Sequence, residues 1–211
     1  WLHIVTSFVL GQKFKDTDIA EQAAGYLPTG DLFNKIYGNT GWKAITIRSL
    51  SIGQGEILVT PLQLANQAAA IANKGYYITP HLNRNDSMKS AIHQTSVDSC
   101  YFDVVHRGME RVMTDGTGRW YNIADLHICG KTGTVQNPHG EDHALFIGFA
   151  PKDDPQIAVA VAVENAGFGA TWACPMATLI IEQYLTGEIK RKSLYNRMAT
   201  ANLIDKEDEQ E

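Results

Sequence analysis

The sequence lacks the features that define several large classes of protein. Its longest nearly uninterrupted apolar stretches, at 144–150 and 157–163, are strand-length and fall far short of the roughly 20 residues of a membrane-spanning helix. Its 18 Lys and Arg are scattered among 23 Asp and Glu, with a net charge of −5, which argues against a nucleic-acid partner. The 44% of hydrophobic residues are enough to bury the core of one domain or of a large part of one.

Cysteine is also scarce, and its spacing is irregular. Cys100, Cys129 and Cys174 form neither a C-x-x-C pair nor a disulfide framework. We interpret them as buried free thiols that pack as small hydrophobic side chains, in preference to a disulfide or a catalytic thiol. We expect no metal and no cofactor. The chain opens on Trp1 without a Met or a leader, so we expect it to be a piece of a longer protein.

Three segments have the periodicity and the end signals of helices. Thr60 caps the clearest one, Pro61 suits its first position, Gln63 completes a capping box, and Gly75 is its expected end. The alanines of this helix predict close packing in a core. Two further amphipathic helices are predicted, at 101–113 and 173–185.

Strands are predicted between the last two helices, at 127–135, 144–150 and 156–164. They indicate an α+β fold, with an antiparallel β-sheet flanked by α-helices. The first 60 residues are typical of loops with short elements. We divide the chain into a domain over 1–187 and a C-terminal tail over 188–211, whose acidic end at 205–211 is expected to be disordered.

Two local patterns leave alternatives open. The run Lys190-Arg191-Lys192 either forms a contact patch or, as is commoner for a charge run after a helix, is simply solvated. The tetrad 131–134, Lys-Thr-Gly-Thr, is consistent with a polar strand end with a turn glycine. It also contains the K-T-G triplet that belongs to the active-site signature of penicillin-binding proteins and class A β-lactamases.

Each position of the tetrad suits an acyl transfer from a D-alanyl-D-alanine peptide. Lys131 supplies positive charge near the terminal carboxylate, and Thr132 and Thr134 supply hydroxyl donors. Gly133 leaves room for a substrate strand, which would bind the edge of the sheet by β-augmentation.

Most of the chain, from about Val5 to Leu185, resembles class B penicillin-binding proteins, and its last segment resembles the elongation-specific subfamily, penicillin-binding protein 2. The segments that carry the resemblance are, in order, SIGQG at 51–55, TPLQLA at 60–65, GYYITPH at 75–81, GTG at 116–118, the tetrad, DH at 142–143, FIGFAP at 146–151 and GFGATWACP at 167–175.

The resemblance implies a penicillin-binding/serine β-lactamase-like transpeptidase fold and the C-terminal part of a transpeptidase domain. Its implied activity is that of a peptidoglycan D,D-transpeptidase, which cross-links the cell wall and is covalently inhibited by β-lactams. Lys131 and Thr134 are then catalytic, with the Thr134 backbone N–H as an oxyanion donor. Thr132, Gly133 and Thr134 bind the stem peptide, and Asp142 and His143 help to orient the active-site edge.

The resemblance also implies partners and a location for the parent protein. The partners are peptidoglycan stem peptides, β-lactam antibiotics, a glycan polymerase and the elongation machinery that sets cell shape. The parent is expected in the cytoplasmic membrane of a bacterium, held by an upstream anchor, with this domain on the outer, periplasmic side.

The chain departs from an active enzyme because it contains neither S-x-x-K nor S-x-N. Thr40-Gly41-Trp42-Lys43 has Thr in place of Ser and lies where the family has a loop. We expect both motifs upstream of Trp1 and this chain alone to be inactive. Two alternatives stay open: a β-lactam-hydrolysing relative, and a non-catalytic module that senses β-lactams or acts as a scaffold.

Overall fold

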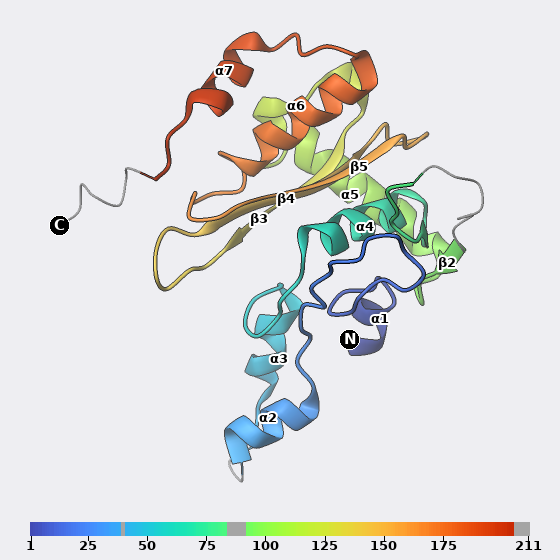
Figure 1. Ribbon diagram of the computed structural model, residues 1–211, viewed down its shortest axis with the longest axis vertical. Coiled ribbons are helices and arrows are strands. Elements are labelled where there is room, and N and C mark those ends of the chain that lie inside the picture. The colour runs from blue at the N-terminus through green and yellow to red at the C-terminus, as the bar shows by residue number, and fades with distance from the viewer. Residues whose placement is uncertain (39–40, 84–91, 205–211) are drawn as a thin grey trace, which may run out of the picture. The chain divides into compact units, whose positions relative to one another are not determined.

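The computed structural model describes residues 1–38, 41–83 and 92–204 (Figure 1). The chain divides into two compact units, Trp1–Phe102 and Asp103–Glu211. The predicted domain boundary at residue 187 stays a prediction. The acidic end at 205–211 lies outside the described residues.

The first unit consists of short helices, loops and one small hairpin. Its helices are α1 (Leu2–Thr6), α2 (Gly30–Tyr37), α3 (Ala44–Ser51) and α4 (Pro61–Ala72), and a 3₁₀ turn, η3 (Ser99–Tyr101), precedes its end. The strands β1 (Tyr76–Ile78) and β2 (Ile92–Gln94) pair antiparallel. The loops with short elements predicted for the first 60 residues are confirmed.

Helix α4 organises this unit, and its predicted start and core packing are confirmed. Thr60 and Gln63 form the capping box. The helix ends at Ala72, three residues before the predicted end at Gly75. Ala70 is fully buried in a cluster whose other buried members are Phe8, Leu10, Leu27, Tyr77 and Phe102.

The second unit contains α5 (Phe102–Thr114), apart from its first residue, and the 3₁₀ turns η4 (Arg119–Tyr121) and η5 (Ala124–Leu126). The strands β3 (Cys129–Val135), β4 (His143–Ala150) and β5 (Ile157–Val163) follow, then α6 (Ala173–Thr186) and α7 (Lys192–Thr200). The predicted helices α5 and α6 and all three strands are confirmed. β3 starts two residues later than predicted, because His127 has a left-handed backbone (φ 44°) that ends η5.

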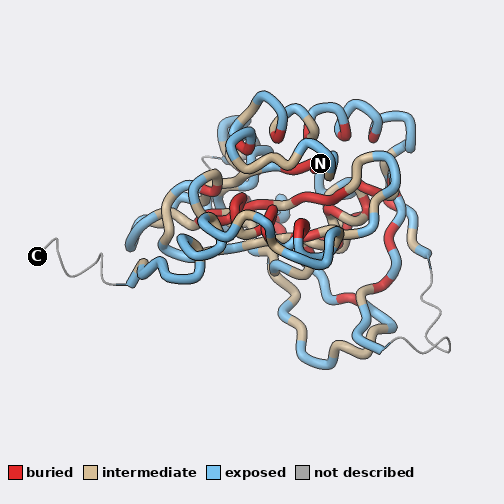
Figure 2. Tube along the Cα trace, turned by 90° about the horizontal axis from the view of Figure 1, so that it is seen from above, coloured by how far each residue is buried: buried red, intermediate tan, exposed pale blue. Residues whose placement is uncertain are grey.

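The three strands form one antiparallel sheet in the order β3-β4-β5, with α6 on one face and α5 on the other (Figure 1). Ala144, Phe146 and Ala150 pack against Ala173, Cys174, Ala177 and Ile181 of α6. Along α5, buried positions recur every three or four residues and lie on one side of the helix (Figure 2). On the other face, the Phe149 ring lies 4.9 Å from the His106 ring of α5.

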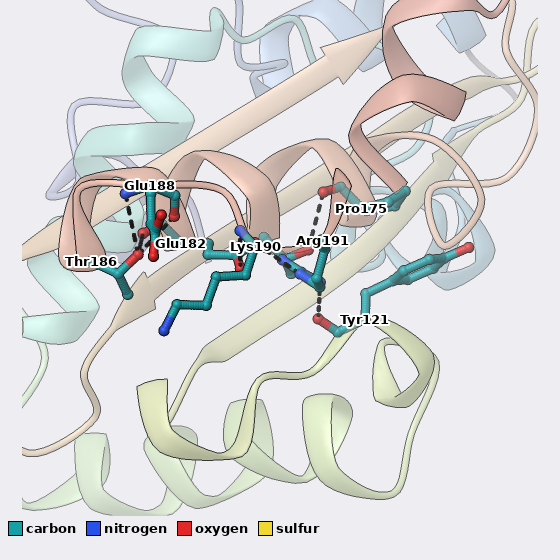
Figure 3. A network of polar contacts seen from close by, with 8 residues as sticks. Tyr121, Pro175, Glu182, Thr186, Glu188, Lys190 and Arg191 are labelled. Atoms are coloured by element: carbon teal, nitrogen blue, oxygen red, sulfur yellow. Dashed lines mark hydrogen bonds and ion pairs between the residues drawn. The ribbon is translucent and has the colours of Figure 1, made fainter. Parts of the chain in front are cut away.

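Helix α7 lies within the segment predicted as a tail, where no helix was predicted. A polar network joins the end of α6 to the chain that leads into α7 (Figure 3). The buried Glu182 accepts hydrogen bonds from the Lys190 amide at 3.0 Å and from Arg191 Nε at 2.9 Å. Within the described parts of the chain, no helix has the length and apolarity needed to cross a bilayer.

Candidate active site

The tetrad lies in the middle of β3, which is the edge strand of the sheet. Lys131 pairs with Ile147, Gly133 with Leu145 and Thr134 with Ala144 across β4. Among the described residues no strand pairs with the other side of β3. The structure thus places the tetrad where an extended peptide could add as a further strand.

The four residues of the tetrad alternate between the two faces of β3, as successive residues of a strand do. Thr132 and Thr134 share the face of Phe146 and Ala144, their partners on β4. Lys131 lies on the opposite face, and its Nζ donates a hydrogen bond of 2.7 Å to the Thr132 carbonyl. An ammonium group has three N–H donors, so this bond does not exhaust it.

Thr117 joins the site through the hydroxyl of Thr132. The two Oγ1 atoms are 2.8 Å apart. Glycines on both sides of Thr117 let this turn pack closely on the end of α5: a Cβ on Gly116 would lie 2.8 Å from Val112 Cα, and one on Gly118 would lie 2.5 Å from Met113 Sδ. The resemblance includes this GTG segment, but no role was predicted for Thr117.

Thr134 is connected to the loop that follows β5. Its Oγ1 accepts a hydrogen bond of 3.3 Å from the Gly169 amide. A Cβ at position 169 would lie 2.5 Å from the Leu145 carbonyl oxygen and would also collide with the Gly133 carbonyl. The loop therefore rests directly on the backbone of β3 and β4, and only glycine permits this approach.

Asp142 and His143 hold that loop from its other end. The Asp142 carbonyl accepts from the amides of Ala166 at 3.0 Å and Gly167 at 2.7 Å. His143 Nδ1 accepts from the Asn165 amide at 3.0 Å. These contacts lie at the turn end of the β3–β4 hairpin, where Val135 pairs with His143, and they join the hairpin to the loop that carries Gly169.

Two asparagines also join the β3–β4 turn to the loop after β5, and neither was predicted from the sequence. Asn137 Nδ2 donates to Asn165 Oδ1 at 2.7 Å, and the Asn137 amide donates to Asp142 Oδ1 at 3.2 Å. Asn165 has a left-handed backbone (φ 51°), which Asn adopts more readily than most residues. An asparagine just after a strand was the available sequence signal.

Two of the three cysteines, Cys129 and Cys174, are buried. Burial raises the pKa of the Cys129 thiol to about 12 and that of the Cys174 thiol to about 12. A thiol with so high a pKa is not a thiolate at neutral pH and is a poor nucleophile. The predicted burial is confirmed for these two residues, but it is wrong for Cys100, which is exposed.

The look-alike segment at 40–43 is involved in local contacts in the first unit. Thr40 lies outside the described residues. Trp42 donates from Nε1 to Asn34 Oδ1 at 3.0 Å, and its ring lies 5.9 Å from that of Phe33. In the described parts of the chain, no group of three or more His, Cys, Asp or Glu could hold a metal ion.

Comparisons with known proteins agree on one family. The family model for the penicillin binding protein transpeptidase domain matches residues 2–182. The peptidoglycan D,D-transpeptidase MrdA of Haemophilus influenzae is 31% identical over 208 residues, covering 85% of this chain and 32% of the relative. The chain spans about a third of the length of the curated relatives that it matches.

Solved structures show the same similarity. The Pseudomonas aeruginosa PBP2 in complex with WCK 5153 matches with a TM-score of 0.76 and 35% identity, over 90% of this chain and 44% of that one. The PBP2 of Helicobacter pylori, in a complex with MreC, matches with a TM-score of 0.72 and 25% identity, over 86% of this chain and 34% of that one.

Proposed function

The chain belongs to the penicillin-binding protein transpeptidase family, and we propose that it forms the substrate-holding side of the active site of an elongation-specific peptidoglycan D,D-transpeptidase. The predicted α+β transpeptidase fold is confirmed by the family match and the solved structures. The single observation that carries the proposal is the Lys-Thr-Gly-Thr tetrad on an edge strand, with both Thr side chains on one face.

In this proposal the donor stem peptide lies alongside the outer edge of β3. Its terminal carboxylate binds the hydroxyls of Thr132 and Thr134, while Lys131 supplies positive potential. Thr117 supports the arrangement, because its hydroxyl lies 2.8 Å from that of Thr132, and two neighbouring hydroxyls can be oriented by one carboxylate. Gly133 keeps the strand edge clear, and the Thr134 backbone N–H donates to the oxyanion.

The chemistry is a two-step acyl transfer. A serine oxygen attacks the carbonyl carbon of the penultimate D-alanine, and its proton passes to a neighbouring lysine, which protonates the departing D-alanine amine. The resulting ester is then attacked by an acceptor amine, which forms the cross-link and releases the serine. A β-lactam carbonyl is attacked in the same way and leaves the enzyme acylated.

The serine and its lysine come, in this proposal, from sequence outside the 211 residues, since the chain contains no S-x-x-K. Asp142 and His143 serve as positioning residues that hold the loop carrying Gly169.

We place the protein at the cytoplasmic membrane through a segment outside this chain, with this domain on the periplasmic side, where peptidoglycan lies. A glycan polymerase and the elongation machinery are its proposed partners, and the Helicobacter pylori neighbour was solved with MreC.

Labelling with a fluorescent penicillin tests this function. The product of the complete gene should be labelled covalently, and replacement of the serine of its S-x-x-K by alanine should abolish the label. The 211-residue chain should remain unlabelled. Labelling of this chain would contradict the proposal that the serine nucleophile lies outside it. If the complete gene product stays unlabelled, the proposed transpeptidase activity is contradicted and a sensing or scaffolding module is favoured. Rapid release of the label would favour a β-lactam hydrolase.

The Thr132→Val substitution in the complete gene product tests the carboxylate site. It keeps the shape of the side chain and removes a hydroxyl whose hydrogen bond to a charged group is worth about 1.5–3 kcal/mol. The second-order rate of penicillin acylation should therefore fall by about tenfold or more. Thr200→Val, which changes an exposed threonine at the end of α7, is the matched control. Equal rates for the two variants would remove Thr132 from the site.

A further inference from the structure

A groove lies in the same unit as the tetrad, and the proposed reaction does not use it. Its volume is about 610 Å³. One wall is formed by residues 120–122, at the end of η4, and the other by residues 190–194 together with Arg197.

The groove is electropositive, although the chain as a whole has a net charge of −5. Its lining contains Lys190, Arg191, Lys192 and Arg197, and no acidic residue is among the lining residues that the structure describes. Lys190 and Lys192 are exposed. Figure 3 shows the Lys190 side chain extending away from the Glu182 network, to which only its backbone amide contributes.

Arg191 is a third cation of the lining. Its Nε donates to Glu182 and its Nη1 donates to the Tyr121 carbonyl at 3.0 Å. Its Nη2 is buried and has no hydrogen-bond partner among the described residues. These bonds to Glu182 and to the Tyr121 carbonyl fix the guanidinium in place, so it contributes a positioned positive charge beside the groove.

An aromatic surface lies beside these cations. The Trp120 side chain is 78% exposed, and the Arg119 guanidinium lies 4.8 Å from its ring centre. Arg197 donates to the Tyr121 hydroxyl at 3.0 Å. An exposed indole is a flat apolar surface with a polar edge, and the C–H face of a sugar ring can stack on such a surface.

We propose that this groove binds an anionic glycopeptide strand, with a sugar ring on Trp120 and carboxylates on Lys190 and Lys192. The inference rests on the proposed function, because a cell-wall glycan carrying peptide carboxylates is the polymer that fits both features. The chain also connects the two sites directly: Thr117, which contacts Thr132, lies in the turn that leads into Arg119–Tyr121. The groove would then hold the glycan whose stem peptide lies on β3.

Co-sedimentation of the complete gene product with purified insoluble peptidoglycan tests this groove. The protein is first acylated with penicillin, which blocks the reaction site and reports separately on the proposed function. Lys190→Gln/Lys192→Gln should weaken binding by about fivefold, because two exposed cations that pair with carboxylates each contribute modestly. Trp120→Ala should weaken it by a similar factor. Lys13→Gln/Lys15→Gln and Tyr101→Ala, which change exposed residues of the first unit, should bind as the unaltered protein does.

Competition separates a glycan from other polyanions. A soluble peptidoglycan fragment should displace the protein, and excess polyglutamate or polyphosphate should displace it poorly. If polyglutamate competes equally well and Trp120→Ala has no effect, the groove binds acidic protein and the proposal is wrong. Unchanged binding of both groove variants also overturns it, whether or not penicillin labels the protein.

Discussion

At Gly169 the loop after β5 lies directly on the backbone of the β3–β4 hairpin. The atoms that a side chain would meet there are the carbonyl oxygens of Gly133 and Leu145. Carbonyls in a sheet cannot rotate away as the end of a flexible side chain can, so the position has little tolerance. Because the Gly169 amide also donates to Thr134, a steric change there reaches the tetrad directly.

Gly169→Ala should therefore lower the free energy of unfolding by about 1–3 kcal/mol through overpacking. Gly108→Ala is the matched control, since a Cβ at this position in α5 would meet nothing within 4 Å. It should stabilise the protein by about 0.5–1 kcal/mol, because it removes glycine from a helix interior. Urea unfolding of both variants measures the contrast. Equal stability of the two variants would show that the loop does not rest on the hairpin in solution.

The tetrad and its edge position could be predicted from the sequence, but the residues around it could not. Lys131 to Thr134 are contiguous and follow an apolar run, so the motif can be recognised from the sequence alone. Thr117 reaches Thr132 across 15 positions, and Asn137 reaches Asn165 across 28. No local periodicity encodes such contacts, because they depend on how the turns fold onto the sheet.

Helices and strands also differ in how far the sequence alone predicts them. α4, α5 and α6 carry their own periodicity or caps, and each was predicted to within a few residues at both ends. The elements of the first 60 residues are instead positioned from a distance. Gln63 donates from Nε2 to the carbonyls of Gln12 at 2.6 Å and Ala24 at 2.9 Å. A buried glutamine in α4 therefore holds two loops whose own sequence gives no comparable signal.

The link between α6 and α7 depends on one buried carboxylate. Glu182 is 4% exposed, and its two oxygens accept from the Lys190 amide and from Arg191 Nε. Arg191 in turn donates to the Tyr121 carbonyl. The start of α7 is thus held to the end of α6 and to η4 by charge-assisted hydrogen bonds, which are stronger than neutral ones.

Glu182→Gln should lower the free energy of unfolding by about 1–3 kcal/mol, because it leaves the partly buried Arg191 without its counter-charge. It should also speed amide hydrogen exchange in α7. Glu188→Gln changes an exposed carboxylate of the same link and should have little effect on either quantity. Denaturant unfolding and hydrogen exchange give the two readouts. Unchanged exchange in α7 would mean that apolar packing alone holds this helix.

At the scale of the whole molecule, different groups are expected to contribute to stability at acid and at alkaline pH. In the first unit, backbone amides of Leu82 and Asn83 lower the pKa of Asp18, with the larger effect from Leu82. The Cys100 amide lowers the pKa of Asp98. A lowered carboxyl pKa contributes stability above the unfolded value, 3.8, and this contribution is lost as the pH falls below it.

The alkaline limit should depend on Cys129 and Cys174 in the second unit. Burial raises both thiol pKa values from 9.0 to about 12, so the unfolded chain loses these protons first. The contribution of the two thiols to stability should be constant below pH about 9 and then fall, by up to about 1.4 kcal/mol per pH unit for each thiol. The raised pKa of Lys152, which hydrogen-bonds Glu110, acts in the same direction.

Urea midpoints measured from neutral pH to above pH 9 test this limit. Cys129→Ala/Cys174→Ala should have a lower midpoint at neutral pH, because it leaves small cavities. Its midpoint should nevertheless fall less steeply at alkaline pH than that of the unaltered protein. Cys100→Ala removes the exposed thiol and should retain the full slope. A double variant with the same alkaline slope as the unaltered protein would show that other groups, such as Lys152, set the limit.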